Sequence, residues 1–96
     1  MIDISKALQK GAQIVLAGRV SDPGLALGPC IYEYGWKKDE YNLLGAGTLA
    51  GHITECGAQC TGGNYSNWED VPDMANLGYP IIEMHENGKF IITKHK

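Results

Sequence analysis

A glycine-rich helical segment places the strongest constraint on how this chain can fold. Between residues 39 and 60, apolar side chains recur at helical spacing, but the same stretch contains Gly45, Gly47, Gly51 and Gly57. Each glycine inside a helix costs up to about 1 kcal/mol relative to alanine, so an isolated helix would not tolerate four of them. Gly47 and Gly51 lie about one turn apart on one helical face. We therefore predict that another backbone, or a ligand, packs very close to this face.

A short apolar run at residues 12–18 predicts a strand that is buried on both faces. Its apolar residues are continuous rather than alternating, which is typical of strands in parallel sheets. A helix over about residues 3–10 is expected before it, and Gly11 stands where a left-handed residue would end that helix. A helix followed by a buried strand is half of an α/β repeat. A second helix is expected over about residues 23–34.

The clearest local signal is Asn-Gly at positions 87–88, between two β-rich runs at residues 80–86 and 89–94. This dipeptide favours a two-residue type I′ turn, which would pair Met84 with Ile91. Together these elements predict an α/β fold. We expect a partial open, Rossmann-like sheet with one buried strand, two or three helices and a C-terminal β-hairpin.

Composition and charge argue against several classes of function. The 96 residues carry a net charge of −3 and a single arginine, which argues against general nucleic-acid binding. No apolar run approaches the roughly 20 residues of a membrane span, and the N-terminus lacks the pattern of a signal peptide, so we expect a cytoplasmic protein. Three cysteines without a CxxC motif are expected to be reduced thiols.

His52 and Glu55 form the densest polar group, because a separation of three residues places both on one helical face. Histidine titrates near neutral pH, so the pair is a candidate for acid/base chemistry. The same pair could bind a metal together with Cys56, or it could be an ordinary hydrogen bond on a helix surface.

Two loops offer candidate binding groups. The loop that follows residues 12–18 carries Arg19 and Asp22, and ligands of open α/β sheets bind beyond the carboxyl ends of the strands. Arg19 could hold a carboxylate or phosphate, or it could form a salt bridge with Asp22. Gly62 and Gly63 could shape an anion-binding nest, or they could belong to a plain turn.

The run AGTLAGHITECGAQCTGG at residues 46–63, with shorter runs at residues 17–23 and 33–36, resembles the N-terminal domain of the acyclic terpene utilisation (AtuA-like) family. The resemblance covers almost the whole chain. Because the family's domains are several times longer, it implies that residues 1–96 are an internal portion of a single, incomplete domain. The positions that match the family's motifs are Arg19, Asp22, His52, Glu55, Cys56, Gln59, Gly62 and Gly63.

The resemblance implies a role in the catabolism of acyclic terpenes such as citronellol and geraniol, or of branched-chain acids, as an enzyme or a binding protein. It transfers no chemical step and no cofactor. The acid/base candidates are His52 and Glu55. The substrate-binding candidates are Arg19, Asp22, Gln59, Gly62 and Gly63. The expected partner is a small acyl or terpenoid acid, or its CoA thioester, and neither nucleic acid nor a membrane. The alternative is a non-catalytic structural or subunit-interface segment, packed against the remainder of the domain or against a second copy.

Overall fold

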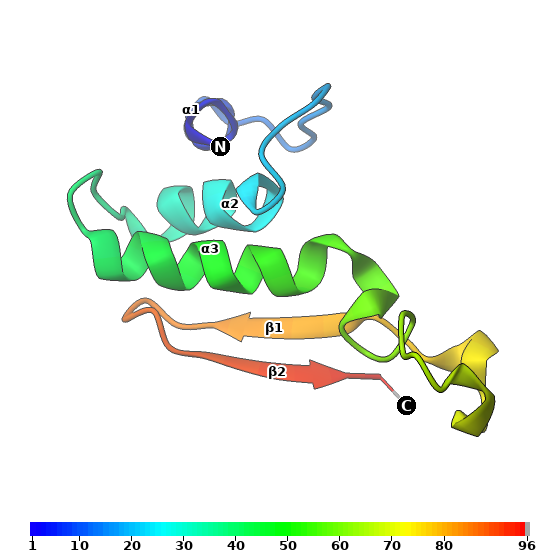
Figure 1. Ribbon diagram of the computed structural model, residues 1–96. Coiled ribbons are helices and arrows are strands. Elements are labelled where there is room, and N and C mark those ends of the chain that lie inside the picture. Colours follow the sequence, from blue (N-terminus) through cyan, green and yellow to red (C-terminus); the bar gives the residue numbers. More distant parts are fainter. Residues whose placement is uncertain (96) are drawn as a thin grey trace.

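Four layers follow one another in chain order (Figure 1). The computed structural model describes residues 1–95. Its elements are α1 (Ile2–Gln9), α2 (Gly24–Tyr34), α3 (Tyr41–Glu55), β1 (Pro80–Met84) and β2 (Phe90–Lys94). Helix α1 packs on α2, α2 packs on α3, and α3 packs on the hairpin through β1. The three helices and the C-terminal hairpin confirm the prediction of a small α/β fold.

The layers enclose only a small core. The buried apolar side chains in the described residues are Ile4, Leu27, Trp36 and Ala50. The molecule measures 46 × 27 × 20 Å, and its radius of gyration is 15.1 Å, whereas a compact chain of this length would have about 12.5 Å. No helix within residues 1–95 is both long enough and apolar enough to cross a membrane.

Helix α1 ends as its sequence predicts. Gly11 has a φ of +90°, and its N–H donates to the carbonyl of Leu8 at 2.9 Å. The N–H of Ala12 donates to the carbonyl of Ala7 at 3.1 Å, which completes a Schellman motif. These bonds satisfy the last carbonyls of the helix, so a left-handed residue is required at this position.

The glycines of α3 allow α2 to approach closely, as predicted. A Cβ atom on Gly51 would lie 2.6 Å from the carbonyl oxygen of Pro23, and one on Gly47 would lie 2.7 Å from Leu27. A Cβ atom on Gly45, in contrast, would meet nothing within 4 Å. The close neighbour of this helical face is therefore the layer that contains α2, and the predicted contact is made within the protein itself.

The prediction of a buried strand at residues 12–18 is wrong. This segment forms no strand in the structure, and the side chains of Ile14 and Leu16 are 88 % and 97 % exposed. A parallel strand needs a neighbouring edge for its N–H and C=O groups. The one sheet of the described residues is the antiparallel β1–β2 pair, which lies on the opposite side of α3 from α1 and α2, so it offers this segment no edge.

The hairpin forms as predicted, but its register differs by one residue. Met84 lies opposite Phe90 rather than Ile91, and His85 N–H donates to the carbonyl of Lys89 at 2.9 Å. The loop therefore has three residues, and Gly88, at a φ of +86°, is its only left-handed residue. This geometry is a type I turn followed by a glycine bulge, whereas a type I′ turn would also require a positive φ at position 87. The difference places Phe90 and Ile92, instead of Ile91, on the same face as Met84.

Two aromatic side chains fasten the end of α2 to the hairpin. Tyr34 donates its hydroxyl to the carbonyl of Met84 at 2.9 Å, and Trp36 donates its indole N–H to the carbonyl of Glu86 at 3.0 Å. Their rings stack with centroids 5.5 Å apart. Gly35 lies between them with a φ of +64°, which ends α2 and turns the chain. This pair of bonds spans the α3 layer.

An arm, defined as residues 61–79, leads from α3 to β1 and protrudes from the stack (Figure 1). It contains two short 3₁₀ turns, Trp68–Asp70 and Met74–Asn76. Thr61 Oγ1 donates to the carbonyl of Gly78 at 2.6 Å, which closes the base of the arm. Lys94 Nζ donates to the carbonyl of Leu77 at 2.8 Å and joins the base to β2.

Candidate functional site

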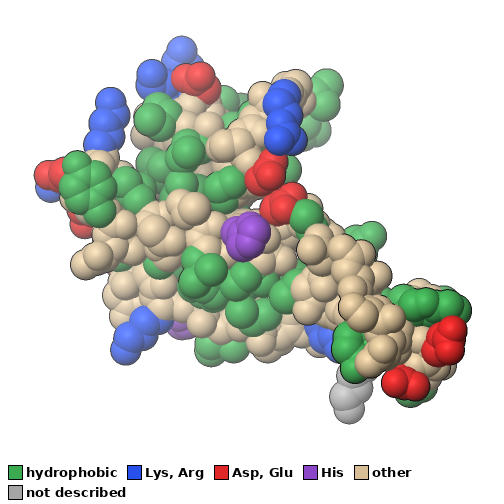
Figure 2. All heavy atoms as spheres, viewed as in Figure 1, with side chains coloured by type: hydrophobic (Ala, Val, Ile, Leu, Met, Phe, Trp, Pro, Cys, Tyr) green, Lys and Arg blue, Asp and Glu red, His purple; other side chains and the backbone are tan. Residues whose placement is uncertain are grey.

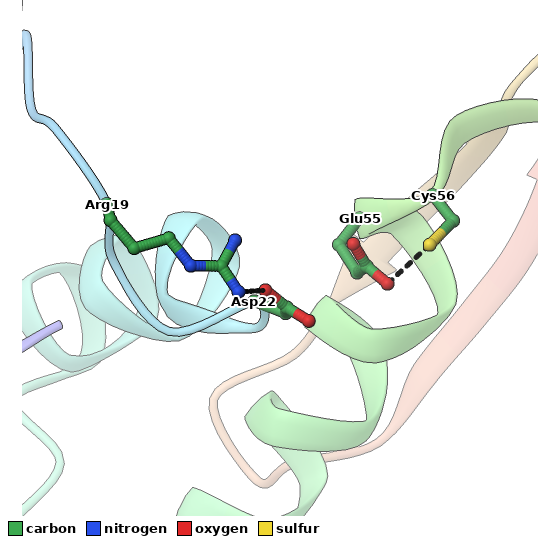
Figure 3. Close-up of polar contacts among 4 residues, drawn as sticks. All are labelled: Arg19, Asp22, Glu55 and Cys56. Carbon is green, nitrogen blue, oxygen red and sulfur yellow. Dashed lines mark hydrogen bonds and ion pairs between the residues drawn. The ribbon is translucent and has the colours of Figure 1, made fainter.

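The candidate site forms where the loop before α2 meets the last turn of α3. Gly51 allows the backbone of Pro23 to lie directly against α3, and Glu55 is about one helical turn farther along. Asp22, the residue before Pro23, is thereby brought close to Glu55 (Figure 3). These two carboxylates line one hollow together with Leu25, Ala26, Gly51 and Thr54. Two segments about 30 residues apart in the sequence therefore meet at this site.

Arg19 and Asp22 form a salt bridge, which is one of the two arrangements predicted for Arg19. The Nη2 and Oδ1 atoms are 2.9 Å apart, and the side chains are 87 % and 48 % exposed. Such an exposed pair contributes at most about 1 kcal/mol to stability. Its main consequence is geometric, because it holds a guanidinium group beside Asp22 while leaving most of its surface open to solvent (Figure 3).

Glu55 accepts a hydrogen bond from the thiol of Cys56. This hydrogen bond is the largest cause that raises the pKa of Cys56 above the ordinary value for a thiol. A slight loss of hydration raises the pKa further, and so do the negative charges of Glu55 and Asp22. The protonated thiol is thus favoured, and since the thiolate is the nucleophilic form, Cys56 is poorly suited to nucleophilic attack.

His52 and Glu55 line one hollow, as their spacing predicts. The other residues around it are Ile53, Cys56, Gln59 and Cys60. The side chain of His52 is exposed on α3, so an imidazole and a carboxylate face solvent over adjacent turns. The alternative of a metal site finds no support, because residues 1–95 contain no group of three or more His, Cys, Asp or Glu side chains placed to hold an ion.

The loop after α3 forms the wall of a third and larger hollow. This hollow has a volume of about 720 Å³, within the range of small-molecule sites, although it is open to solvent. The N–H of Gly63 donates to the carbonyl of Ala58 at 2.8 Å, and the N–H of Gly62 donates to Gln59 at 3.4 Å. Because both donors are used inside the loop, the arrangement is a turn rather than an anion-binding nest. Gln59 and Gly63 line this hollow together with Glu55 and Cys56.

The family model described as acyclic terpene utilisation family protein AtuA matches residues 1–96. The chain belongs to this AtuA family. No curated protein and no solved structure matches it.

In this AtuA-family chain, the matched motif serves two different purposes. Gly47 and Gly51 face α2 and set the distance between the helices. His52 and Glu55 lie on the exposed side of the same helix, Cys56 follows its last residue, and all three line the hollows. One motif therefore contains both the packing surface of α3 and the candidate chemistry.

Thr54 and Tyr79 are among the lining residues that were not predicted from the sequence. Thr54 borders the hollow of Asp22 and Glu55, and Tyr79 borders the larger hollow, where its ring lies over Gly57. Thr54 is adjacent to Glu55 and could have been found from its place in the motif. Tyr79 comes from the far end of the arm, and nothing in the local sequence signals that it returns to α3.

Proposed function

We propose that this chain takes part in acyclic terpene or branched-chain acid catabolism by binding a small acyl or terpenoid acid, or its CoA thioester, beside Asp22 and Glu55. One observation carries the proposal. Arg19 and Asp22 from one loop gather with Glu55 and Cys56 from α3 at the same seam (Figure 3). Family membership supports the class of substrate.

Arg19 is the proposed anchor for the negative end of the ligand. Its side chain is 87 % exposed, and a guanidinium has five donors, so pairing with Asp22 leaves others for a carboxylate or phosphate. The hydrocarbon part of the ligand would lie along Leu25 and Ala26, which line the hollow between Asp22 and Glu55. Apolar walls with a few charged groups at one end suit a short branched acid.

His52 and Glu55 are the proposed acid/base pair. Both face the solvent side of α3 and border one hollow, where a bound ligand could exchange a proton with either. Gln59 supplies an amide that can donate to or accept from a carbonyl. Gly62 and Gly63 would act by shaping the loop that borders the larger hollow, because their own N–H groups are engaged.

A binding experiment tests this proposal. Titration calorimetry of the 96-residue chain with citronellic acid should give saturable binding, and citronellol, which lacks the carboxylate, should bind at least tenfold more weakly. Arg19→Ala should weaken binding of the acid by about tenfold or more, whereas Lys38→Ala, an exposed change outside the site, should leave it unchanged. Glu55→Gln should retain or tighten binding, because it removes a negative charge near the ligand. The assignment of Arg19 fails if Arg19→Ala and Lys38→Ala bind the acid equally.

The close packing of α3 favours a second candidate function. A Cβ atom on either Gly47 or Gly51 would clash with the layer of α2, so these motif glycines serve packing. If the whole motif serves packing, the chain is a structural or subunit-interface segment without chemistry. In that case, citronellic acid and its CoA thioester would show no saturable binding, and His52→Ala would leave the fold and its stability unchanged.

A further inference from the structure

Two exposed surfaces of opposite charge lie apart on the molecule, one at the α1 end of the stack and one on the arm that protrudes from it (Figure 1). We define the amino-terminal surface as Lys6, Lys10, Ile14 and Leu16, and the second surface is the arm at residues 61–79. Residues 1–18 contain two basic residues and one acidic residue. The arm contains three acidic residues and neither lysine nor arginine. Figure 2 shows basic side chains around the α1 end and acidic ones beside hydrophobic ones on the arm.

Both surfaces also expose apolar side chains. Leu16 is 97 % exposed and Ile14 is 88 % exposed in a segment that makes no strand. On the arm, Trp68 is 58 % exposed and Tyr65 is 52 % exposed. Exposed apolar groups rimmed by polar and charged ones are typical of protein–protein contacts, and Trp and Tyr are enriched among the residues that dominate them.

We infer that the occupant of each surface is the complementary surface of a second copy of this chain, in an antiparallel dimer with two-fold symmetry. Every copy carries one surface of each sign, so the arm of one copy meets the amino-terminal surface of the other, and the reverse contact forms at the same time. Such a closed arrangement leaves no surface unused. The 46 Å length of the molecule allows two copies to lie side by side with their ends exchanged.

The first test is the oligomeric state of the wild-type chain as a function of salt. Sedimentation velocity at 50 mM NaCl should show a discrete dimer. At 500 mM NaCl, the dissociation constant should rise at least tenfold, because charges across the contact are screened. Leu16→Ser should weaken the dimer at both salt concentrations, whereas Tyr41→Ser, an exposed change at the start of α3 outside both surfaces, should not. A monomer at every concentration overturns the inference.

The second test exchanges the charges of one surface at a time. Lys6→Glu with Lys10→Glu makes the amino-terminal surface acidic, and Glu69→Lys with Asp70→Lys makes the arm basic. Each double variant alone should be monomeric, because like charges then meet at both contacts. An equimolar mixture of the two should form a dimer again, since every contact in the mixed pair joins opposite charges.

Circular dichroism checks that both double variants retain the helical content of the wild type. All four positions are exposed, so the fold should tolerate the changes. If the mixture stays monomeric while both variants are folded, the two surfaces do not meet. If the wild type forms larger assemblies instead of dimers, the contact is not closed by two-fold symmetry and the proposed arrangement is wrong.

Discussion

Trp36 donates its indole N–H to the carbonyl oxygen of Glu86 at 3.0 Å, and this bond joins two positions 50 residues apart. The donor is buried, since the Trp36 side chain is 6 % exposed. The bond fixes the hairpin loop against the end of α2, with α3 enclosed between them. The residues Tyr34-Gly35-Trp36 therefore act as a clasp around α3 rather than as a binding platform.

Removing the indole donor should weaken this clasp. Trp36→Phe retains an aromatic ring but leaves the Glu86 carbonyl without its partner, so we expect the free energy of unfolding to fall by about 1–2 kcal/mol. Urea denaturation followed by circular dichroism measures this change. Trp68→Phe, on the exposed arm, is the matched control and should change stability by less than about 0.5 kcal/mol. Equal effects of the two substitutions would contradict the role of the clasp.

Two glycines of α3 should respond oppositely to the same substitution. Gly51→Ala places a Cβ atom 2.6 Å from the carbonyl oxygen of Pro23, so α2 and α3 must separate, and we expect a loss of about 1–3 kcal/mol. Gly45→Ala meets nothing within 4 Å and should stabilise the protein by up to about 1 kcal/mol through helix propensity. Thermal unfolding of both variants checks the prediction. A stabilised Gly51→Ala would show that the helices do not pack as described.

The hairpin loop offers a test of its register. Gly88 has a φ of +86°, so Gly88→Ala should cost about 1–2 kcal/mol. Asn87 is not left-handed, and its Oδ1 atom accepts a bond from the Lys89 N–H at 3.1 Å, so Asn87→Ala should cost no more than about 1 kcal/mol. Denaturant midpoints of the two variants compare these costs. A two-residue type I′ turn would make both substitutions similarly unfavourable.

The Cys56 thiol should alkylate slowly because its pKa is raised, chiefly by the hydrogen bond to Glu55. A raised pKa means less thiolate at pH 8, so the rate with iodoacetamide should be several-fold lower in the native protein than in urea. Glu55→Gln removes the carboxylate, lowers the pKa and should raise the native rate several-fold. Asp22→Asn should have a smaller effect in the same direction. Peptide mass spectrometry at several pH values resolves Cys56 from the other cysteines, and no response to Glu55→Gln would rule out this cause.

Features that depend on local backbone geometry were predicted from the sequence. Gly11 and Gly35 both have a positive φ and end helices. A glycine directly after a run of helical residues is a local signal, so these helix ends can be predicted from a few neighbouring residues. The close approach to Gly47 and Gly51 was also predictable, because a glycine-rich helical face has no other simple physical cause. The hollow shared by His52 and Glu55 follows from helical periodicity alone.

Features that depend on distant contacts were not predictable in the same way. Gly88 of the hairpin loop packs close to Leu43 and Ala46 of α3, a contact that no pattern within the hairpin contains. The apolar run at residues 12–18 would need a neighbouring strand on each side in order to form a buried strand. The run itself does not reveal whether such neighbours exist, and in the structure its large apolar side chains are exposed. The contribution of Tyr79 to the larger hollow depends on the path of the arm.

The chain-ordered stack has a consequence for how the molecule opens. Helix α1 rests mainly on α2, whereas α3 is covered by α2 on one side and by the clasped hairpin on the other. Amide protons of α1 should therefore exchange with solvent through detachment of that one layer, and those of α3 only when the whole structure unfolds. The free energy of opening is thus lower for α1 than for α3. The most protected backbone lies in the helix whose last turn carries His52 and Glu55, so these two residues of the candidate site stay in place when α1 detaches.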